Sequence, residues 1–174
     1  IKKIILSVGR LDPAKNYGQL IEAVSEIKTK VKLLLIGKGY LEKTLKDQAK
    51  KLNVNLEIIE MVPHNKLPEI YNSANVYVQC SLSEAPVKTL LEAMSCGLPC
   101  VGTDVPGIRD VISNNIDGLL VQLSVNGIKN GIEKVLSDSK LSKKLGDNAR
   151  SKIITKYNLQ RFLQLETRVL LSLR

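Results

Sequence analysis

Two cations follow the first apolar segment of the sequence. The segment ends at Gly9, Arg10 comes next, and Lys15 stands five residues later. A guanidinium can bind phosphate oxygens through two parallel hydrogen bonds, and an ammonium adds a compact positive charge. Gly9 has no side chain and would let the backbone approach a ligand closely. The pattern indicates a phosphate site, with a solvated loop in a lysine-rich protein as the alternative.

Two glutamates bracket the start of a predicted helix near the middle of the chain. Glu84 precedes Pro86, a residue suited to the first helical position, and Glu92 follows roughly 9 Å along the helix axis. At that scale, carboxylates on either side of a diphosphate could hold sugar hydroxyls and ribose hydroxyls. The alternative is that Glu84 is a surface residue and Glu92 an ordinary helix-face carboxylate.

The first turn of this helix has backbone amides without an evident cap. Ala85 would occupy the position where a capping oxygen normally lies, and alanine has none. Amides without acceptors attract anions such as a diphosphate, and the positive end of the helix dipole adds to that attraction. The candidate contacts here are Val87, Lys88, Thr89 and Leu90.

Alternating strands and helices must position these residues. Apolar runs at 4–8 and 33–36 are typical of strands covered on both faces, and a glycine closes each. Further strands are predicted at 56–61, 76–78, 100–102 and 118–121, and intervening helices at 20–27, 41–52, 66–73, 87–96 and 108–112. The order predicts the α/β class: a Rossmann-like, doubly wound parallel sheet of six strands with helices on both faces. Ligands of such sheets bind at the carboxyl edge of the strands.

A helical C-terminal tail is predicted beyond the sheet, with helices at 128–136, 141–154 and 159–173. The 174 residues contain no internal repeat or linker, so we expect one domain over 1–174. The sequence starts at Ile1 directly in a strand and shows no signal peptide. This start suggests an excised domain that lacks an N-terminal portion.

Composition narrows the function classes. Lys and Arg total 26 against 17 Asp and Glu, a net charge of +9, while aromatic residues make up only 3%. The lysines are dispersed and lack interleaved aromatics, so a basic nucleic-acid-binding domain is the weaker alternative. No apolar run approaches the ~18 residues of a membrane span, although a basic surface is compatible with peripheral membrane association. The cysteines, Cys80, Cys96 and Cys100, lack paired spacing and are interpreted as reduced core thiols in a cytoplasmic protein.

The order of the motifs resembles family 4 of the retaining glycosyltransferases. The matching segments are Gly9-Arg10 with Lys15-Asn16, Leu33-Leu34-Leu35-Ile36-Gly37-Lys38-Gly39, Tyr71-Asn72-Ser73-Ala74-Asn75, Glu84-x7-Glu92-Ala93-Met94, Cys96-Gly97-Leu98-Pro99, Thr103-Asp104-Val105-Pro106-Gly107-Ile108 and Asp117-Gly118-Leu119-Leu120-Val121. The resemblance covers residues 1 to 125 in order. It implies a GT-B enzyme with two Rossmann-like domains, of which this chain is the C-terminal, nucleotide-sugar-binding one and an N-terminal acceptor domain is the other.

The resemblance also implies residue roles. Arg10 and Lys15 would contact the diphosphate of a UDP-, GDP- or ADP-sugar, Glu84 the transferred sugar, and Glu92 the ribose. The loop Val62-Pro63-His64 would meet the nucleobase through its backbone. No cofactor or metal is expected, since the family is usually metal-independent, no Asp-x-Asp occurs and the single histidine completes no metal-ligand cluster.

One departure from the family pattern lies at Pro86-Val87, where a Phe-Gly-like pair is usual. His64 has two interpretations, a base or donor contact and a loop-surface residue, and Met61 and Met94 are predicted to fill the core. An epimerase or phosphorylase of the same architecture, or a domain that only binds, are the alternative functions. The donor half alone is expected to transfer no sugar, since catalysis needs both reactants held together.

Overall fold

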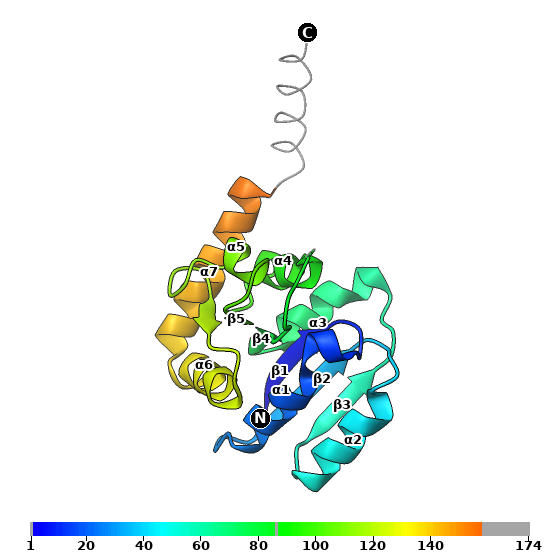
Figure 1. Cartoon of the computed structure of the whole chain (residues 1–174). Helices are drawn as coiled ribbons and strands as arrows, with labels where there is room; N and C mark the ends of the chain where they lie inside the picture. The colour runs from blue at the N-terminus through cyan, green and yellow to red at the C-terminus, as the bar shows by residue number, and fades with distance from the viewer. Residues whose placement is uncertain (1, 86, 158–174) are drawn as a thin grey trace.

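Six parallel strands form one sheet in the computed structural model, which describes residues 2–85 and 87–157 (Figure 1). The strands are β1 (Lys3–Val8), β2 (Val31–Ile36), β3 (Leu56–Ile59), β4 (Val76–Gln79), β5 (Cys100–Thr103) and β6 (Leu119–Val121). Their order across the sheet is β3-β2-β1-β4-β5-β6, and each neighbouring pair is parallel. The predicted α/β class and six-stranded parallel sheet are therefore confirmed.

The helices alternate with the strands as the sequence predicts. They are α1 (Tyr17–Ser25), α2 (Glu42–Lys51), α3 (Leu67–Ser73), α4 (Lys88–Ser95), α5 (Ile108–Val111), α6 (Val125–Ser137) and α7 (Ser139–Lys156). Two 3₁₀ turns, η1 (Pro13–Lys15) and η2 (His64–Lys66), lie in segments without helical periodicity. The helix predicted at 159–173 lies outside the described residues.

Side chains of each strand alternate between two buried layers. Ile5 points into the layer formed with α1, α2 and α6, and Leu6 into the layer formed with α3, α4 and α5. Helix α7 contributes Leu145 to the first layer and Ala149 to the second. Because both faces are covered, the central strands are apolar at successive positions rather than at alternate ones.

The sheet has a topological switch point between β1 and β4. These two strands are neighbours, yet β1 continues through α1 to β2 on one side and β4 continues through α4 to β5 on the other. The connections diverge there, and open α/β sheets bind ligands outside the carboxyl ends of the strands at such a point. The loops after β1 and β4 carry Arg10, Lys15 and Glu84.

Two predictions for the end of β3 are wrong. Strand β3 ends at Ile59, not at Met61, and the Met61 side chain is exposed rather than part of the core. Strand β3 is an edge strand, and the chain leaves the sheet before Met61 reaches the packed layer. Met94, by contrast, is fully buried as predicted.

The three cysteines, all within the described residues, are free thiols. Cys80 and Cys100 are buried, as expected for core residues, while Cys96 is half-buried. Burial raises the pKa of the Cys80 thiol to about 12 and also raises the pKa of Cys100. Both thiols are therefore weak nucleophiles at neutral pH.

Candidate functional site

Lys15 and Glu84 meet at the switch point. The Lys15 Nζ donates to Glu84 Oε1 at 2.6 Å and to Glu84 Oε2 at 2.7 Å. Only 16% of the lysine side chain and 9% of the glutamate side chain are exposed. Glu84 is therefore a held, nearly buried carboxylate and not the surface residue of the alternative interpretation.

Backbone contacts between the loops after β1 and β4 bring this pair together. The Leu82 N–H donates to the Ala14 carbonyl at 2.9 Å, and the Cys80 thiol donates to the Lys15 carbonyl at 3.1 Å. Directly after Lys15, Asn16 takes a left-handed backbone conformation (φ 56°), which asparagine tolerates better than most residues. That turn ends η1 and starts α1, so Lys15 is fixed at the sheet edge.

Gly9 leaves room for two neighbouring side chains at the end of β1. A Cβ at this position would lie 2.9 Å from the Tyr17 hydroxyl oxygen and 3.2 Å from Lys15 Cε. A side chain at this position would therefore collide with Tyr17 and crowd Lys15. The glycine lets Lys15 cross the end of β1 on its way to Glu84.

Arg10 lies apart from the Lys15–Glu84 pair. Its side chain is 80% exposed, and its Nη2 lies 3.1 Å from Asp12 Oδ2. The loop that carries Arg10 is bonded to the loop after β2, because the Leu11 N–H donates to the Lys38 carbonyl at 3.0 Å. Arg10 is therefore held at the sheet edge through its backbone, while its guanidinium extends into solvent.

A buried polar chain that the sequence analysis missed lies beneath Glu84. Gln79 Nε2 donates to Glu84 Oε2 at 3.0 Å, and the Tyr77 hydroxyl lies 2.6 Å from Gln79 Oε1 and 2.9 Å from Thr89 Oγ1. The chain thus connects the β4–α4 loop to the first turn of α4. The one signal in the sequence was a glutamine at the end of an otherwise apolar strand, where a core residue is the usual choice.

Glu92 forms a second cluster on the next turn of α4. It accepts a hydrogen bond from the Tyr71 hydroxyl at 2.9 Å, and its other oxygen lies 3.4 Å from His64 Nε2 and 3.8 Å from Lys88 Nζ. Burial, followed by the Glu92 charge, raises the pKa of Tyr71, so its hydroxyl stays protonated as a donor. The sequence placed His64 and Glu92 in one site, but nothing in their spacing indicated that they lie within 3.4 Å.

Helix α4 starts one residue later than predicted, at Lys88 and not at Val87. The helix starts at Lys88 with Val87 at the N-cap position, so Ala85 is not the capping position, and Pro86 lies outside the described residues. Valine has no capping oxygen, and no side-chain cap bond forms there. The expectation of a first turn without a side-chain cap is therefore confirmed at a shifted position.

The first-turn residues differ in what they can offer a ligand. The Lys88 side chain is 70% exposed, while the Thr89 hydroxyl is taken up by Tyr77. Leu90 is completely buried, so its side chain cannot touch a ligand and only its amide could. In the loop after β3, Val62 is half-buried, Pro63 and His64 are exposed, and the Pro63 carbonyl accepts from Lys66 at 2.8 Å.

Gly107, in the loop after β5, supports the Glu84 backbone. It has a φ of +84°, and a Cβ there would lie 1.8 Å from the Glu84 carbonyl oxygen. Only glycine permits both this conformation and this approach. The Thr103–Ile108 motif of the sequence therefore contributes a contact surface for the Glu84 loop.

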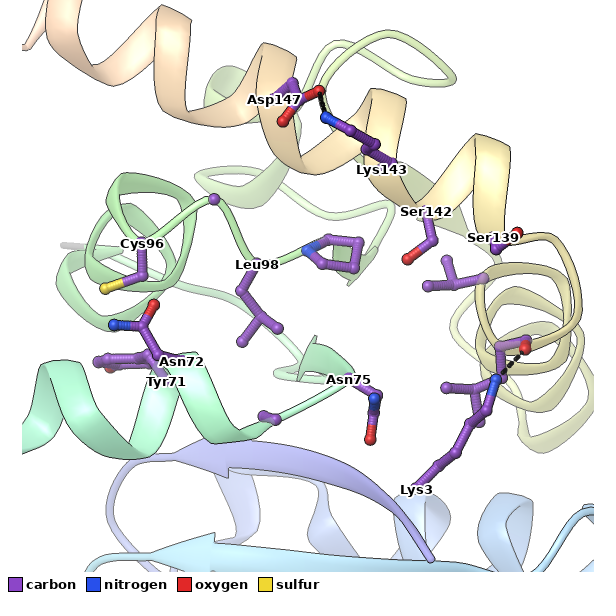
Figure 2. A pocket seen from close by; sticks show the side chains of 15 residues that line it. Lys3, Tyr71, Asn72, Asn75, Cys96, Leu98, Ser139, Ser142, Lys143 and Asp147 are labelled. Atoms are coloured by element: carbon purple, nitrogen blue, oxygen red, sulfur yellow. Dashed lines mark hydrogen bonds and ion pairs between the residues drawn. The ribbon is translucent and has the colours of Figure 1, made fainter. Parts of the chain in front are cut away.

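A separate cavity of about 400 Å³ lies at the opposite edge of the sheet, near the amino ends of β1, β4 and β5 (Figure 2). None of the predicted site residues lines it. The two lysines on its wall have partners: Lys3 donates to the Leu136 carbonyl and Lys143 pairs with Asp147. The predicted site lies instead at the carboxyl edge.

Residues 2–85 and 87–157 contain no group of three or more histidine, cysteine, aspartate or glutamate side chains arranged to hold a metal ion. Within the same residues, no helix is long and apolar enough to span a bilayer.

Comparison with known proteins decides the family. The model of the family described as glycosyl transferases group 1 matches residues 1–152. The chain belongs to this family. It corresponds to the C-terminal domain of the GT-B fold, as the resemblance predicted.

The glycosyl transferases group 1 relatives are longer proteins. The chain is 32% identical over 152 residues to the Campylobacter jejuni N-acetylgalactosamine-N,N'-diacetylbacillosaminyl-diphospho-undecaprenol 4-alpha-N-acetylgalactosaminyltransferase, covering 86% of the chain and 42% of the relative. It is 28% identical over 170 residues to the Bacillus anthracis N-acetyl-alpha-D-glucosaminyl L-malate synthase, covering 95% of the chain and 45% of the relative. The chain thus spans less than half the length of these relatives.

Solved structures agree with this assignment. The catalytic domain of cholesterol-alpha-glucosyltransferase from Helicobacter pylori superposes with a TM-score of 0.82 at 29% identity, covering 91% of this chain and 100% of that one. The Anabaena protein Alr3699/HepE, crystallised with UDP and glucose, gives a TM-score of 0.91 at 20% identity, covering 98% of this chain and 48% of that one. At that identity the second likeness supports the fold alone.

Proposed function

We propose that this domain of a group 1 glycosyltransferase binds a nucleotide-sugar at the carboxyl edge between β1 and β4. The observation that carries the proposal is the Lys15–Glu84 pair, which lies at the topological switch point. The Lys15 ammonium is a cation suited to phosphate, and the Glu84 carboxylate is an acceptor suited to sugar hydroxyls. The N-terminus of α4, which lacks a side-chain cap, follows directly in sequence.

The proposed roles follow the geometry of the edge. Lys15 and Arg10 bind the diphosphate together with the amides of the first turn of α4. Glu84 accepts hydrogen bonds from the transferred sugar, and Glu92 from the ribose. The backbone of residues 62–64 borders the nucleobase, close to Glu92 through the contact with His64.

The same residues account for the chemistry expected of retaining transfer. When the bond between the sugar and the diphosphate breaks, negative charge builds up on the phosphate oxygens. In this proposal Lys15, Arg10 and the positive end of α4 stabilise that charge, with the exposed Arg10 side chain turning toward the bound diphosphate. Fixed positive groups are most effective where water is excluded. Lys15 is well suited because it is mostly buried.

Transfer to an acceptor requires a second surface. We infer that an acceptor-binding domain forms the other wall of the cleft, because the relatives are about twice as long as the matched segment. The domain by itself is therefore expected to bind donor weakly and to transfer no sugar. We place the whole enzyme in the cytoplasm, with its basic surface available for peripheral contact with a membrane.

A thermal-shift screen against UDP-, GDP- and ADP-sugars tests the proposal. A ligand present at 100 times its dissociation constant stabilises the folded state by about 2.7 kcal/mol, which is readily detected. We expect at least one nucleotide-sugar and its nucleoside diphosphate to raise the melting temperature. Failure of all three classes to do so would reject the proposed function.

A further inference from the structure

Gln79 is a polar side chain in a layer of apolar ones. Its exposure is 2%, and the preceding residues of β4, Val76, Tyr77 and Val78, are at 0–1%. Burying an amide costs free energy unless all its polar atoms find partners. Packing alone does not explain a glutamine at position 79, because leucine would fill a similar volume.

All the hydrogen-bonding capacity of Gln79 is used. Its Nε2 donates to Glu84 Oε2 at 3.0 Å and to Ser81 Oγ at 3.0 Å. Its Oε1 accepts from the Tyr77 hydroxyl at 2.6 Å and from Thr89 Oγ1 at 3.4 Å. The amide is therefore anchored on both sides by residues of β4 and α4.

The orientation of this amide follows from its neighbours. The Glu84 carboxylate can only accept hydrogen bonds, so the NH₂ group must face it and the carbonyl must face the hydroxyls. Burial raises the pKa of Tyr77 well above its ordinary value, which keeps the Tyr77 hydroxyl protonated as a donor to Gln79. Gln79 thus presents one rigidly directed donor to Glu84.

Lys15 is the other donor to Glu84 among the described residues, and it is a flexible one. In the proposed function, the Lys15 ammonium turns toward a diphosphate when donor binds. Glu84 would then lose its two hydrogen bonds from Lys15 and keep the one from Gln79. We propose that Gln79 is a positioning residue that holds the Glu84 carboxylate ready for the sugar hydroxyls while Lys15 binds phosphate. This inference rests on the proposed function.

The test compares each nucleotide-sugar with its own nucleoside diphosphate by isothermal titration. The probes are UDP-glucose with UDP, GDP-mannose with GDP and ADP-glucose with ADP. Gln79→Met keeps the volume and removes the donor. Of the four side chains that Gln79 contacts, Glu84 is the one proposed to bind the sugar, and none of the others is proposed to bind phosphate through its side chain. We therefore expect this variant to weaken nucleotide-sugar binding about tenfold, the value of one hydrogen bond to a charged group, with nucleoside diphosphate binding within about twofold of wild type.

Thr103→Val is the matched control. Thr103 is 1% exposed, and its hydroxyl lies 2.8 Å from the Ser81 carbonyl oxygen and 3.4 Å from the Gln79 carbonyl oxygen. Its loss therefore removes buried hydrogen bonding to the backbone of the same segment without removing a donor to Glu84. Thr103→Val should leave the ratio of nucleotide-sugar affinity to nucleoside diphosphate affinity unchanged. A general structural effect of Gln79→Met would instead weaken both ligands alike, and that result would overturn the inference.

Gln79→Glu is the second variant and covers the case in which Gln79→Met fails to fold. It keeps the shape and the contact with Tyr77 but places an acceptor where Glu84 needs a donor, so it should also lower nucleotide-sugar affinity selectively. Wild-type affinity ratios in Gln79→Glu would overturn the inference while leaving the proposed function standing. If the wild-type chain binds none of the six probes, the proposed function fails and the inference falls with it.

Discussion

Lys15 and Arg10 carry the same charge but differ in their surroundings. Lys15→Ala leaves the nearly buried Glu84 with Gln79 as its one remaining described donor, so we expect a loss of about 1–3 kcal/mol in the free energy of unfolding. Arg10→Ala removes an exposed pair with Asp12 and should change stability by less than about 0.5 kcal/mol. Chemical denaturation of both variants measures this difference. Equal losses would show that the buried pair is not formed in solution.

The same two variants should both weaken nucleoside diphosphate binding, by about tenfold to a hundredfold, because each removes a charge-assisted hydrogen bond. Titration with UDP, GDP and ADP provides the readout. Unchanged curves for both variants would place the phosphate site elsewhere.

Glu84 and Glu92 should differ in which ligand they affect. Glu92→Gln is expected to weaken nucleotide and nucleotide-sugar alike, because the ribose is common to both. Glu84→Gln should act mainly on the nucleotide-sugar. Calorimetric titration of both ligand types into both variants tests this assignment, and an equal loss of nucleotide affinity in Glu84→Gln would remove Glu84 from the sugar pocket.

Among the elements, the loop after β5 supports the site through Gly107. Gly107→Ala adds the strain of a sparsely populated backbone conformation (φ +84°, ψ −51°), about 1–3 kcal/mol, and forces the Glu84 backbone to move. Gly97→Ala is the matched control, because Gly97 has a φ of +71° and a Cβ added there would lie 3.7 Å from its nearest neighbour, the Gly146 carbonyl oxygen. We expect Gly107→Ala to lower the melting temperature more than Gly97→Ala does and to weaken nucleotide-sugar binding, which Gly97→Ala should not. Equal behaviour of the two variants would mean that the Glu84 loop adapts freely.

The elements themselves could be predicted because burial on both faces gives strands a continuous apolar pattern. Helix α4 shows where such prediction ends. Its apolar spacing locates the helix, but its first residue depends on how the chain leaves β4, and the helix starts at Lys88 with Val87 as its cap. Met61 was placed wrongly for a related reason, since its burial depended on where an edge strand stops.

In the molecule as a whole, several buried thiols and phenols should make the fold sensitive to alkali. Burial raises the pKa of Cys80 from 9.0 to about 12 and also raises the pKa of Cys100, Tyr17 and Tyr77. These groups keep their protons in the folded state while the unfolded chain loses them. The free energy of unfolding therefore contains the full contribution of these groups below about pH 9. It falls as the pH rises toward the pKa values that the groups have in the folded state. Denaturation at about pH 7 and about pH 10 checks this, and equal stabilities would contradict the burial of these groups.

The positions of Lys15 and Glu84 in the fold could be predicted from the sequence, because each follows the end of a strand. Parallel strands bring the loops after β1 and β4 to one edge, so Lys15 and Glu84 could be expected there. Their direct pairing, and the support from Gln79 and Gly107, depend on side-chain packing between segments far apart in the chain, which no local spacing records.

All the proposed residue roles depend on the binding of a nucleotide-sugar at the carboxyl edge between β1 and β4. Backbone amide NMR spectra of the labelled domain, recorded during titration with UDP-glucose, GDP-mannose and ADP-glucose, test it most directly. We expect the largest shifts on residues 9–16, on Glu84 and on the first turn of α4. Shifts confined to the cavity at the opposite edge, around Asn75 and Ser139, would contradict it.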